Sequence, residues 1–202
     1  MAIFPIVPVP VPSVGMSSES ADAAPPPMAA AADPVRVLLL RHGQSEWNAV
    51  QRWQGTADSP LTALGREQAI ETAWTLAGIN TVFGALWASD LSRAAETAAV
   101  IGEALALGAP RIDARLREAH AGEWEGMTPV EIEAGWPGWL EEHHRPPSFE
   151  PYHAVVERAT AALRDIAADA IARAGNAPAA ALVVTHSGLI RSVIRHLGTE
   201  DE

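Results

Sequence analysis

The sequence predicts an α/β fold, in which a mostly parallel sheet carries helices on both faces. Short apolar segments of strand length alternate along the chain with segments of helical periodicity, which is the pattern of βα units. The segments 35–40 and 181–185 are apolar almost throughout, as expected of strands that are buried on both faces. With 202 residues, the chain is also long enough to bury a sizeable core.

Residues 1–33 differ in composition from the rest of the chain. They are rich in Pro, Ala and Ser, with three consecutive prolines at 25–27, and contain no Lys or Arg. Because such a segment favours extended, solvated conformations, we expect a disordered leader over 1–33 and one domain over 34–202. Prolines interrupt the apolar start and no positive charge precedes it, so we expect no secretory signal. Met16 and Met28 leave open where translation begins.

The first strand and the first long helix follow the leader. Residues 35–40 form the strand, and the polar residues after it open a loop or a short helix. Thr62 is a suitable N-cap for a helix that reaches about residue 76, and Gly78 ends that helix. The helix residues whose spacing places them in the core are Ala69, Ile70, Ala73, Trp74 and Ala77.

A second strand, a helix and a third strand occupy the middle of the chain. Residues 82–88 form a short apolar run, and a helix follows from 92 to about 107. Between 111 and 116 apolar residues alternate with charged ones, which predicts a third strand near an edge of the sheet. The charged segment 117–125 contains glycine and is expected to be a loop.

The last third of the chain repeats the pattern of helix, strand and helix. Thr128 begins a short helix, and the polar, proline-rich segment 141–151 forms a loop or cap. A long amphipathic helix spans 154–174. Residues 181–185 form the fourth strand, and a final helix spans 189–197.

Charge and composition exclude several classes of function. The net charge of −11 argues against a nucleic-acid partner, which would need a basic patch. The chain has no cysteine, so disulfides, thiolate nucleophiles and cysteine metal sites are excluded. No run of 18 apolar residues exists, so we expect no transmembrane helix and no membrane partner. If so negative a protein handles anionic substrates, it must concentrate its arginines locally.

Polar residues of similar type follow three of the predicted strands. His42 and Gly43 come after the first predicted strand, and His186 and Gly188 come after the last one. Arg93 lies in the first turn of the helix that follows the second predicted strand. Ligands sit beyond the carboxyl ends of parallel strands, and helix N-termini attract anions. We therefore expect these side chains to gather at one anion site, with glycines that let the backbone approach a ligand closely. A lone histidine is more often structural, but the coincidence at three strand ends favours a site.

Five blocks of residues carry a family resemblance. They are Arg41-His42-Gly43 with Asn48, Gly55 and Leu61-Thr62 with Gly65, Ser89-Asp90-Leu91-Ser92-Arg93-Ala94 with Glu96-Thr97, Leu116-Arg117-Glu118 with Gly122-Glu123-Trp124-Glu125-Gly126, and Thr185-His186-Ser187-Gly188. In this order they resemble the histidine phosphatase superfamily, which includes the cofactor-dependent phosphoglycerate mutases. The resemblance spans about residues 35–197. Arg-His-Gly alone would be a weak signal, whereas five ordered blocks are specific.

The resemblance implies a mechanism and a role for each of these residues. His42 would be the nucleophile that accepts the phosphoryl group, and water would then hydrolyse the phosphohistidine. Arg41, Arg93 and His186 would hold the phosphoryl oxygens. Glu118 would be the general acid that protonates the leaving group. Further substrate contacts are expected from Asn48, Gln54, Ser187 and Gly188.

Several other residues are candidates for the pocket wall or for a metal site. Residues expected to line the pocket or to shape its loops are Arg52, His120, Trp47 and Trp124. His143, His144 and His153 would be the candidates for a metal site, but no cysteine or carboxylate stands beside them at motif spacing. We expect these histidines to be solvated surface residues, and we expect neither a metal nor a cofactor.

Departures from the family pattern favour a phosphatase over a mutase. Ser187 follows the second histidine where mutases have asparagine or glycine-rich variants, and the interval from Glu118 to His186 is short. A short cap would leave the phosphohistidine open to water. Where many relatives carry a Gly-Glu-Ser turn, this chain has the different segment 146–151. Relatives generally continue beyond Gly198 with another strand, so we expect a truncated C-terminal part or an uncovered sheet edge.

The sequence therefore predicts a cytoplasmic phosphomonoester hydrolase that acts on a small phosphorylated metabolite through a phosphohistidine. One alternative is a phosphoglycerate mutase, which would return the phosphoryl group from His42 to the substrate. The other is a non-catalytic phosphate-binding protein. The residues that decide the substrate lie in the variable cap, 128–151. Neither the substrate nor the oligomeric state can be predicted from the sequence.

Overall fold

The computed structural model describes residues 7–8, 35–175 and 177–198. Its strands form one sheet in the order β1-β2-β5-β3-β4. The strands are β1 (Val7–Pro8), β2 (Arg36–Arg41), β3 (Ala85–Ala88), β4 (Arg111–Ile112) and β5 (Ala180–Thr185). β1 pairs with β2 antiparallel, and the other neighbours are parallel. The predicted α/β class with a mostly parallel sheet is confirmed.

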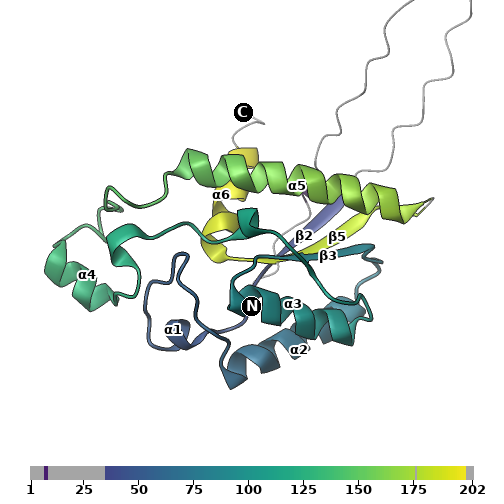
Figure 1. Ribbon diagram of the computed structural model, residues 1–202, viewed down its shortest axis with the longest axis horizontal. Coiled ribbons are helices and arrows are strands. Elements are labelled where there is room, and N and C mark those ends of the chain that lie inside the picture. The colour runs from purple at the N-terminus through teal and green to yellow at the C-terminus, as the bar shows by residue number, and fades with distance from the viewer. Residues whose placement is uncertain (1–6, 9–34, 176, 199–202) are drawn as a thin grey trace, which may run out of the picture.

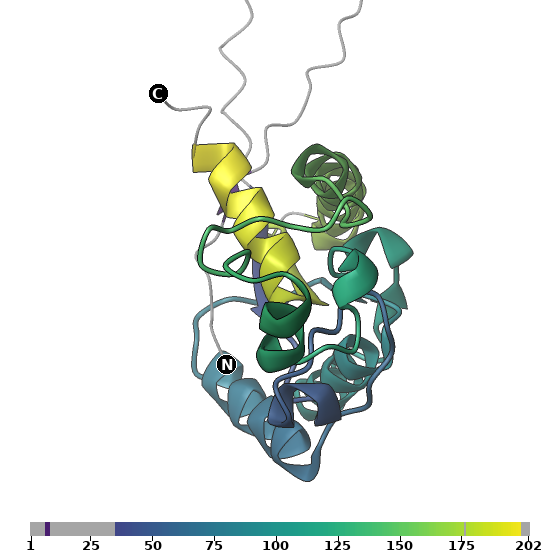
Figure 2. The same cartoon turned by 90° about the vertical axis from the view of Figure 1, so that its left-hand side faces the viewer.

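Two helices cover each face of the sheet (Figures 1 and 2). One face carries α5 (Tyr152–Ala174) and α6 (Ser187–Gly198), and the other carries α2 (Ala63–Ala77) and α3 (Ser92–Ala104). Thr62 caps α2 as predicted, because its Oγ1 accepts a hydrogen bond from the backbone N–H three residues later. None of the helices that the structure describes is long and apolar enough to cross a membrane.

Strand β2 contributes side chains to both cores, which explains its continuous apolar sequence. Val37 and Leu39 pack with the residues of α5 and α6. Leu38 and Leu40 pack on the opposite face, with α2 and α3. All four side chains are buried. A parallel strand covered on both sides is apolar at every position instead of at alternate ones, so the core fixes the position of the polar residues at the end of β2.

The predicted third strand is much shorter than 111–116. The structure has β4 over Arg111–Ile112, and a 3-10 helix over Ala114–Leu116. The Asp113 side chain accepts a hydrogen bond from the backbone N–H of Arg115 at 2.8 Å. This side-chain bond caps the turn and ends the extended conformation. β4 does lie last in the sheet order, as predicted for an edge.

The prediction for the core face of α2 was wrong for three residues. Ala69 and Ala73 are buried, but Ile70, Trp74 and Ala77 are exposed, and Trp74 is 70% exposed. The side chains that α2 buries follow a narrow stripe at helical spacing, namely Gly65, Ala69, Thr72, Ala73 and Leu76. The three exposed residues each lie one position beyond a residue of this stripe, and so on the solvent side of the helix.

A small cap lies over the carboxyl ends of the strands, where Figures 1 and 2 show α1 and α4. It includes α1 (Glu46–Ala49) and α4 (Pro129–Gly135). The cap has an apolar cluster of its own, built around the fully buried Trp124 and Ile132. Three further tryptophans pack against this cluster, at 53, 136 and 139. Because it has this core, the cap holds a fixed wall opposite the strand ends.

The two ends of the chain lie largely outside the described residues. The leader predicted over 1–33 is described only at Val7–Pro8, which forms β1 beside β2. Residues 199–202 are likewise outside the described part of the chain.

Candidate active site

Three strand ends meet at one edge of the sheet. β2, β5 and β3 are adjacent, and the register aligns Arg41 with Thr185 and Ala88 with Val184. His42 directly follows β2, and its backbone N–H donates to the carbonyl of Thr185 at 3.0 Å. His186 directly follows β5. The ring centroids of His42 and His186 lie 5.1 Å apart with an edge-on geometry, so the strand order brings the two histidines together.

The hydrogen bonding of His42 identifies the nitrogen that is free to react. Its Nδ1 lies 2.6 Å from the carbonyl oxygen of Gly43. Because a carbonyl oxygen can only accept, Nδ1 carries the hydrogen, and the lone pair of the neutral ring is on Nε2. His42 is only 6% exposed, yet it lines a cavity. Nε2 is therefore the atom that can attack a bound electrophile.

Burial and neighbouring cations keep both imidazoles neutral. The pKa of His42 is lowered to about 3, mainly by burial and also by the positive charges of Arg93 and Arg41. The hydrogen bond to Gly43 raises the pKa, but by less than these contributions lower it. Burial also lowers the pKa of His186 well below its ordinary value, with further contributions from His42 and Arg93. A nucleophilic histidine must be unprotonated, and both rings meet this condition near pH 7.

The buried neutral His42 makes folding stability sensitive to acid. The unfolded chain binds a proton on this ring below its ordinary pKa of about 6.5, whereas the folded chain does not until the pH approaches 3. Stability is therefore lost as the pH falls between these values. At pH 5 the loss of unfolding free energy from His42 alone is about 2 kcal/mol.

Urea unfolding at pH 7.5 and pH 5.0 tests this sensitivity: between the two pH values the wild type is expected to lose about 2 kcal/mol more unfolding free energy than His42→Gln. Equal losses would contradict the buried neutral state.

Arg93 and His186 present buried polar atoms without protein partners. The two Nη atoms of Arg93 donate to the carbonyls of Ala57 at 2.8 Å and Gly55 at 2.9 Å. A guanidinium has five N–H donors, so three are uncommitted; its Nε has no partner among the described residues. Burial lowers the pKa of Arg93 to about 10, so it stays charged at pH 7. Within the same described part of the chain, neither ring nitrogen of His186 has a partner. Such orphaned groups fit an anionic ligand.

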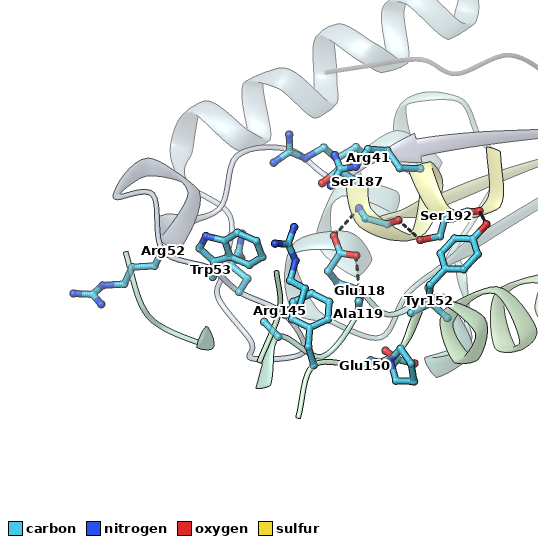
Figure 3. A pocket seen from close by; sticks show the side chains of 18 of the residues that line it. Arg41, Arg52, Trp53, Glu118, Ala119, Arg145, Glu150, Tyr152, Ser187 and Ser192 are labelled. Carbon is cyan, nitrogen blue, oxygen red and sulfur yellow. Dashed lines mark hydrogen bonds between the residues drawn. The ribbon is translucent and has the colours of Figure 1, made fainter. Parts of the chain in front are cut away.

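A cavity of about 920 Å³ opens beside His42 (Figure 3). Arg41, Arg93 and Glu118 line it together with His42. The other predicted site residues that line it are Asn48, Gln54, Ser187 and Gly188. His186 is fully buried and lies against the His42 ring. The structure thus brings every residue that the sequence assigned to the site to one cavity or to its immediate wall.

Glu118 is held at the start of α6. Its carboxylate accepts hydrogen bonds from the backbone N–H groups of Gly188 at 2.8 Å and Leu189 at 3.0 Å. A third bond comes from the N–H of Ala119 at 3.0 Å. The first turn of α6 has unpaired N–H groups and a positive dipole end, which suit a carboxylate. In this conformation Glu118 occupies the N–H group of Gly188, a residue from which a substrate contact is expected.

The two glycines at the strand ends each lie close to another part of the protein, and Gly188 also lines the cavity. A Cβ on Gly43 would clash with the backbone of Gly65 in α2, and a Cβ on Gly188 would clash with the carboxylate of Glu118. In each case the close neighbour is part of the protein. Glycine is required at Gly43, because the neighbouring backbone cannot move aside. At Gly188 a larger residue would displace the Glu118 carboxylate from its place at the start of α6.

Asn48 and Gln54 are both oriented by Ser45. Asn48 Oδ1 accepts from the backbone N–H of Ser45 at 3.2 Å, as part of the capping box of α1. Gln54 Oε1 lies 2.8 Å from Ser45 Oγ, which donates to it. With the oxygens so engaged, the amide nitrogens are the parts of these side chains that can donate to an anion in the cavity.

Most of the residues expected to line the pocket or shape its loops do not line the cavity. Arg52 lines it, whereas Trp47, Trp124 and His120 do not. Trp124 is buried in the core of the cap, and His120 Nδ1 accepts from the N–H of Gly122 at 2.9 Å. These residues lie in or near the motif blocks because they support the structure of the loops, and not because they line the cavity.

The three histidines considered for a metal site are separated in the structure. His143 lines the cavity, His144 packs its ring against Trp139, and His153 is exposed on α5. Within the described ranges, no group of three or more His, Asp and Glu residues is arranged to hold a metal ion.

Sequence reasoning missed the residue that braces the Glu118 loop. Arg158 of α5 donates to the carbonyls of Arg115 and Arg117, both at 2.7 Å, and to that of Glu118 at 3.1 Å. Its Nε also donates to the carboxylate of Glu150 at 2.7 Å. The contacts join segments about 40 residues apart, so no local pattern marks Arg158 in advance.

Three arginines that line the cavity were also missed: Arg145, Arg191 and Arg195. Arg191 and Arg195 follow Ser187 at intervals of four residues on α6. Residues at this spacing lie on one face of a helix, so the periodicity measured from Ser187 could have placed them in the site. Arg145 lies in the segment between α4 and α5, where the sequence contains no such periodicity.

Comparison with known proteins gives a family match. Residues 37–201 match the family described as the histidine phosphatase superfamily, branch 1. A glucosyl-3-phosphoglycerate phosphatase of Mycolicibacterium vanbaalenii is 47% identical over 104 residues, which cover 51% of this chain and 44% of that protein. A probable phosphoglycerate mutase of Enterobacter sp. is 39% identical over 140 residues, which cover 65% of this chain and 62% of that protein.

Solved structures are similar over more of the chain. A mycobacterial glucosyl-3-phosphoglycerate phosphatase in complex with VO3 has a TM-score of 0.67 and 32% identity, covering 78% of this chain and 79% of that one. The chain spans less than half of the length of the glucosyl-3-phosphoglycerate phosphatases among its curated relatives.

Proposed function

The chain belongs to the histidine phosphatase superfamily, and from this premise we propose that it is a phosphomonoester hydrolase acting through a phosphohistidine on His42. The observation that carries the proposal is the buried, neutral His42, which faces a cavity lined by Arg41 and Arg93 and contacts His186.

In the first step Nε2 of His42 attacks the phosphorus of the bound ester. The phosphorus–nitrogen bond forms as the ester phosphorus–oxygen bond breaks in line with it, and the Nδ1–H bond to Gly43 holds the ring in place. Charge on the transferred phosphoryl group is stabilised by Arg41, Arg93 and His186. Arginine suits this task, because its planar fork matches two phosphoryl oxygens at once.

Glu118 supplies and recovers the proton. The leaving alkoxide takes a proton from the carboxyl group in the first step. In the second step the carboxylate accepts a proton from the water that attacks the phosphohistidine, which releases inorganic phosphate and free His42. For the first step, one carboxyl oxygen must turn from the N–H groups of α6 toward the leaving oxygen.

Hydrolysis is favoured over the mutase reaction by the access of water to the cavity. Arg145 and Arg191 line the cavity and are exposed to solvent at the same time, so the cavity that His42 lines is open to water. A mutase must instead keep its phosphohistidine long enough to return the phosphoryl group. Because probable phosphoglycerate mutases are among the relatives, the mutase reaction is the second candidate function.

The test is an assay of phosphate release from a panel of phosphomonoesters. Glucosyl-3-phosphoglycerate belongs first in the panel, because the names of the relatives from Mycolicibacterium and Mycobacterium give it as their substrate. We expect release of inorganic phosphate and no formation of 2-phosphoglycerate from 3-phosphoglycerate, even with a bisphosphoglycerate primer. Primer-dependent interconversion without phosphate release would instead identify a mutase, and no turnover of any ester would overturn the proposal.

We also propose that the protein works in the cytoplasm, where small phosphorylated metabolites occur. Fractionation of the native host cells with an antibody against the protein tests this.

A further inference from the structure

The ring of His42 is oriented by a peptide group of its own chain. Its Nδ1 donates to the carbonyl oxygen of Gly43 at 2.6 Å. The torsion that turns an imidazole about its Cβ–Cγ bond has broad minima, so a rotamer preference alone leaves the direction of Nε2 loosely defined. The hydrogen bond to Gly43 has to set that direction, and it can do so only if the Gly43 carbonyl is itself held in place.

The Gly43 carbonyl shares a rigid plane with the backbone N–H of Gln44. The C=O and N–H of one planar trans peptide point in opposite directions and can only turn together. The Gln44 N–H donates to Oε1 of Gln68 in α2 at 2.9 Å. Gln68 therefore anchors this peptide at the end opposite to the one that His42 contacts. Hydrogen bonds at the two ends of a peptide also strengthen each other.

Gln68 reaches this peptide because the chain after β2 lies directly on α2. A Cβ on Gly43 would clash with the carbonyl of Gly65, and a Cβ on Gly65 would clash with the carbonyl of Gln44. Gln68 lies three residues beyond Gly65 and so on the same face of the helix. The close approach of the two glycines thus places the Gln68 side chain beside the Gln44 N–H.

The preceding peptide is held from α3, which packs beside α2 (Figure 1). The backbone N–H of Gly43 donates to Oγ1 of the buried Thr97 at 3.1 Å. That hydroxyl in turn donates to the carbonyl of Arg93 at 2.7 Å, one helical turn earlier. The two peptides after His42 are therefore fixed from two helices, and the one whose carbonyl meets the imidazole is fixed by Gln68.

We propose that Gln68 is a positioning residue for the nucleophile, which holds the His42 ring through the Gly43–Gln44 peptide and so aims Nε2 at the phosphoryl group. The inference rests on the proposed function and adds to it a residue outside the cavity. Gln68 contacts neither the substrate nor the reacting atoms, so its replacement should slow the attack and leave anion binding unchanged. If Gln68 only satisfied the Gln44 N–H, its replacement would lower the stability of the fold without this selective loss.

Gln68→Met removes the acceptor oxygen at nearly constant side-chain length. It is expected to lower kcat/KM for p-nitrophenyl phosphate about tenfold or more, because a small displacement of a reacting group is costly. The inhibition constant of inorganic phosphate should stay within about twofold of the wild-type value, since the anion donors are untouched. Gln68→Glu keeps an acceptor oxygen at the same place and should retain kcat/KM within about threefold of the wild type. Gln68→Ala also lacks the acceptor and should behave as Gln68→Met, so the test does not depend on the folding of one variant.

NMR of protein with ¹⁵N-labelled histidine, recorded without substrate, observes the ring directly. In the wild type and in Gln68→Glu we expect His42 as the Nδ1–H tautomer, with a hydrogen that exchanges slowly with water. In Gln68→Met this hydrogen should exchange faster. The spectrum of His42→Gln identifies the signal by its absence. Glu67→Met is the matched control, because Glu67 is the neighbouring residue of α2, is exposed and lies outside the cavity; it should match the wild type in both measurements.

An unchanged kcat/KM or an unchanged His42 signal in Gln68→Met would overturn the inference. An equal loss of activity in Gln68→Glu would overturn it too, because the hydrogen bond would then not be the cause. If the wild type hydrolyses no ester at all, the proposed function fails, and the His42 signal alone decides on Gln68. In that case faster exchange of the Nδ1 hydrogen in Gln68→Met would support the positioning role, and equal exchange would overturn it.

Discussion

His42→Gln is expected to lower phosphate release from p-nitrophenyl phosphate by roughly 10⁴-fold or more. Glutamine fills a similar space but has no nitrogen lone pair, so no covalent phosphoryl intermediate can form. The hydrogen bond from Nδ1 to Gly43 leaves Nε2 as the lone-pair nitrogen, and burial with the nearby Arg93 keeps the ring unprotonated. Loss of this one atom therefore removes the first chemical step, while the anion donors around it stay in place.

The measurement should follow the intermediate as well as the product. Wild-type protein that is quenched during turnover of a labelled ester should carry acid-labile, base-stable phosphate, and His42→Gln should carry none. His153→Gln is a suitable control, because His153 is exposed on α5 and does not line the cavity. Circular dichroism checks that each variant is folded. If His42→Gln retained the phosphoenzyme, another residue would have to be the nucleophile.

The parts of the fold that sequence predicted well are those in which burial dictates the residue types. β2 and β5 are buried on both faces, so their apolar runs stop where the strands reach the edge of the sheet at Arg41 and Thr185. The residues after such a stop have to lie at the carboxyl edge, which is why the meeting of His42 and His186 could be expected before any coordinates existed.

Short edge elements and helix faces were less predictable, because few residues decide them. The Asp113 side chain accepts one hydrogen bond from a backbone N–H group, and a 3-10 helix takes the place of the second half of the predicted strand. Trp74 is apolar and still 70% exposed. Whether a helix residue is buried depends on its place relative to the buried stripe of that helix, and not on the residue type alone. Local patterns also cannot reveal Arg158, whose partners come from a distant loop.

The position of Glu118 illustrates the same limit within the site. The spacing of the motif blocks identified the residue, but it gave no sign that its carboxylate caps α6. Arg158 of α5 donates to the backbone carbonyl of the same residue, so the Glu118 loop is bound to α5 through its backbone and to α6 through its side chain. Glu118 consequently has two separable tasks, helix capping and proton transfer, and these make different predictions.

Glu118→Gln is expected to lower kcat/KM for alkyl phosphomonoesters such as glycerol 3-phosphate by about 10²- to 10⁴-fold. The loss for p-nitrophenyl phosphate should be far smaller, because p-nitrophenolate is a weak base that leaves without being protonated. Glutamine cannot donate a carboxyl proton, but its Oε1 can still accept one of the N–H bonds at the start of α6. Steady-state kinetics of the two substrates on one protein preparation gives the ratio directly.

The capping task alone would produce a different outcome. A carboxylate that only stabilised α6 would, when replaced, lower the thermal unfolding temperature and reduce both activities by the same factor, leaving their ratio unchanged. Glu123→Gln is the matched control in the same loop: Glu123 bonds to Ser148 and lies outside the cavity, so its replacement should preserve the ratio. Dependence of the loss on the basicity of the leaving group is what separates a proton donor from a helix cap, because only proton transfer depends on how strongly the departing oxygen holds a proton.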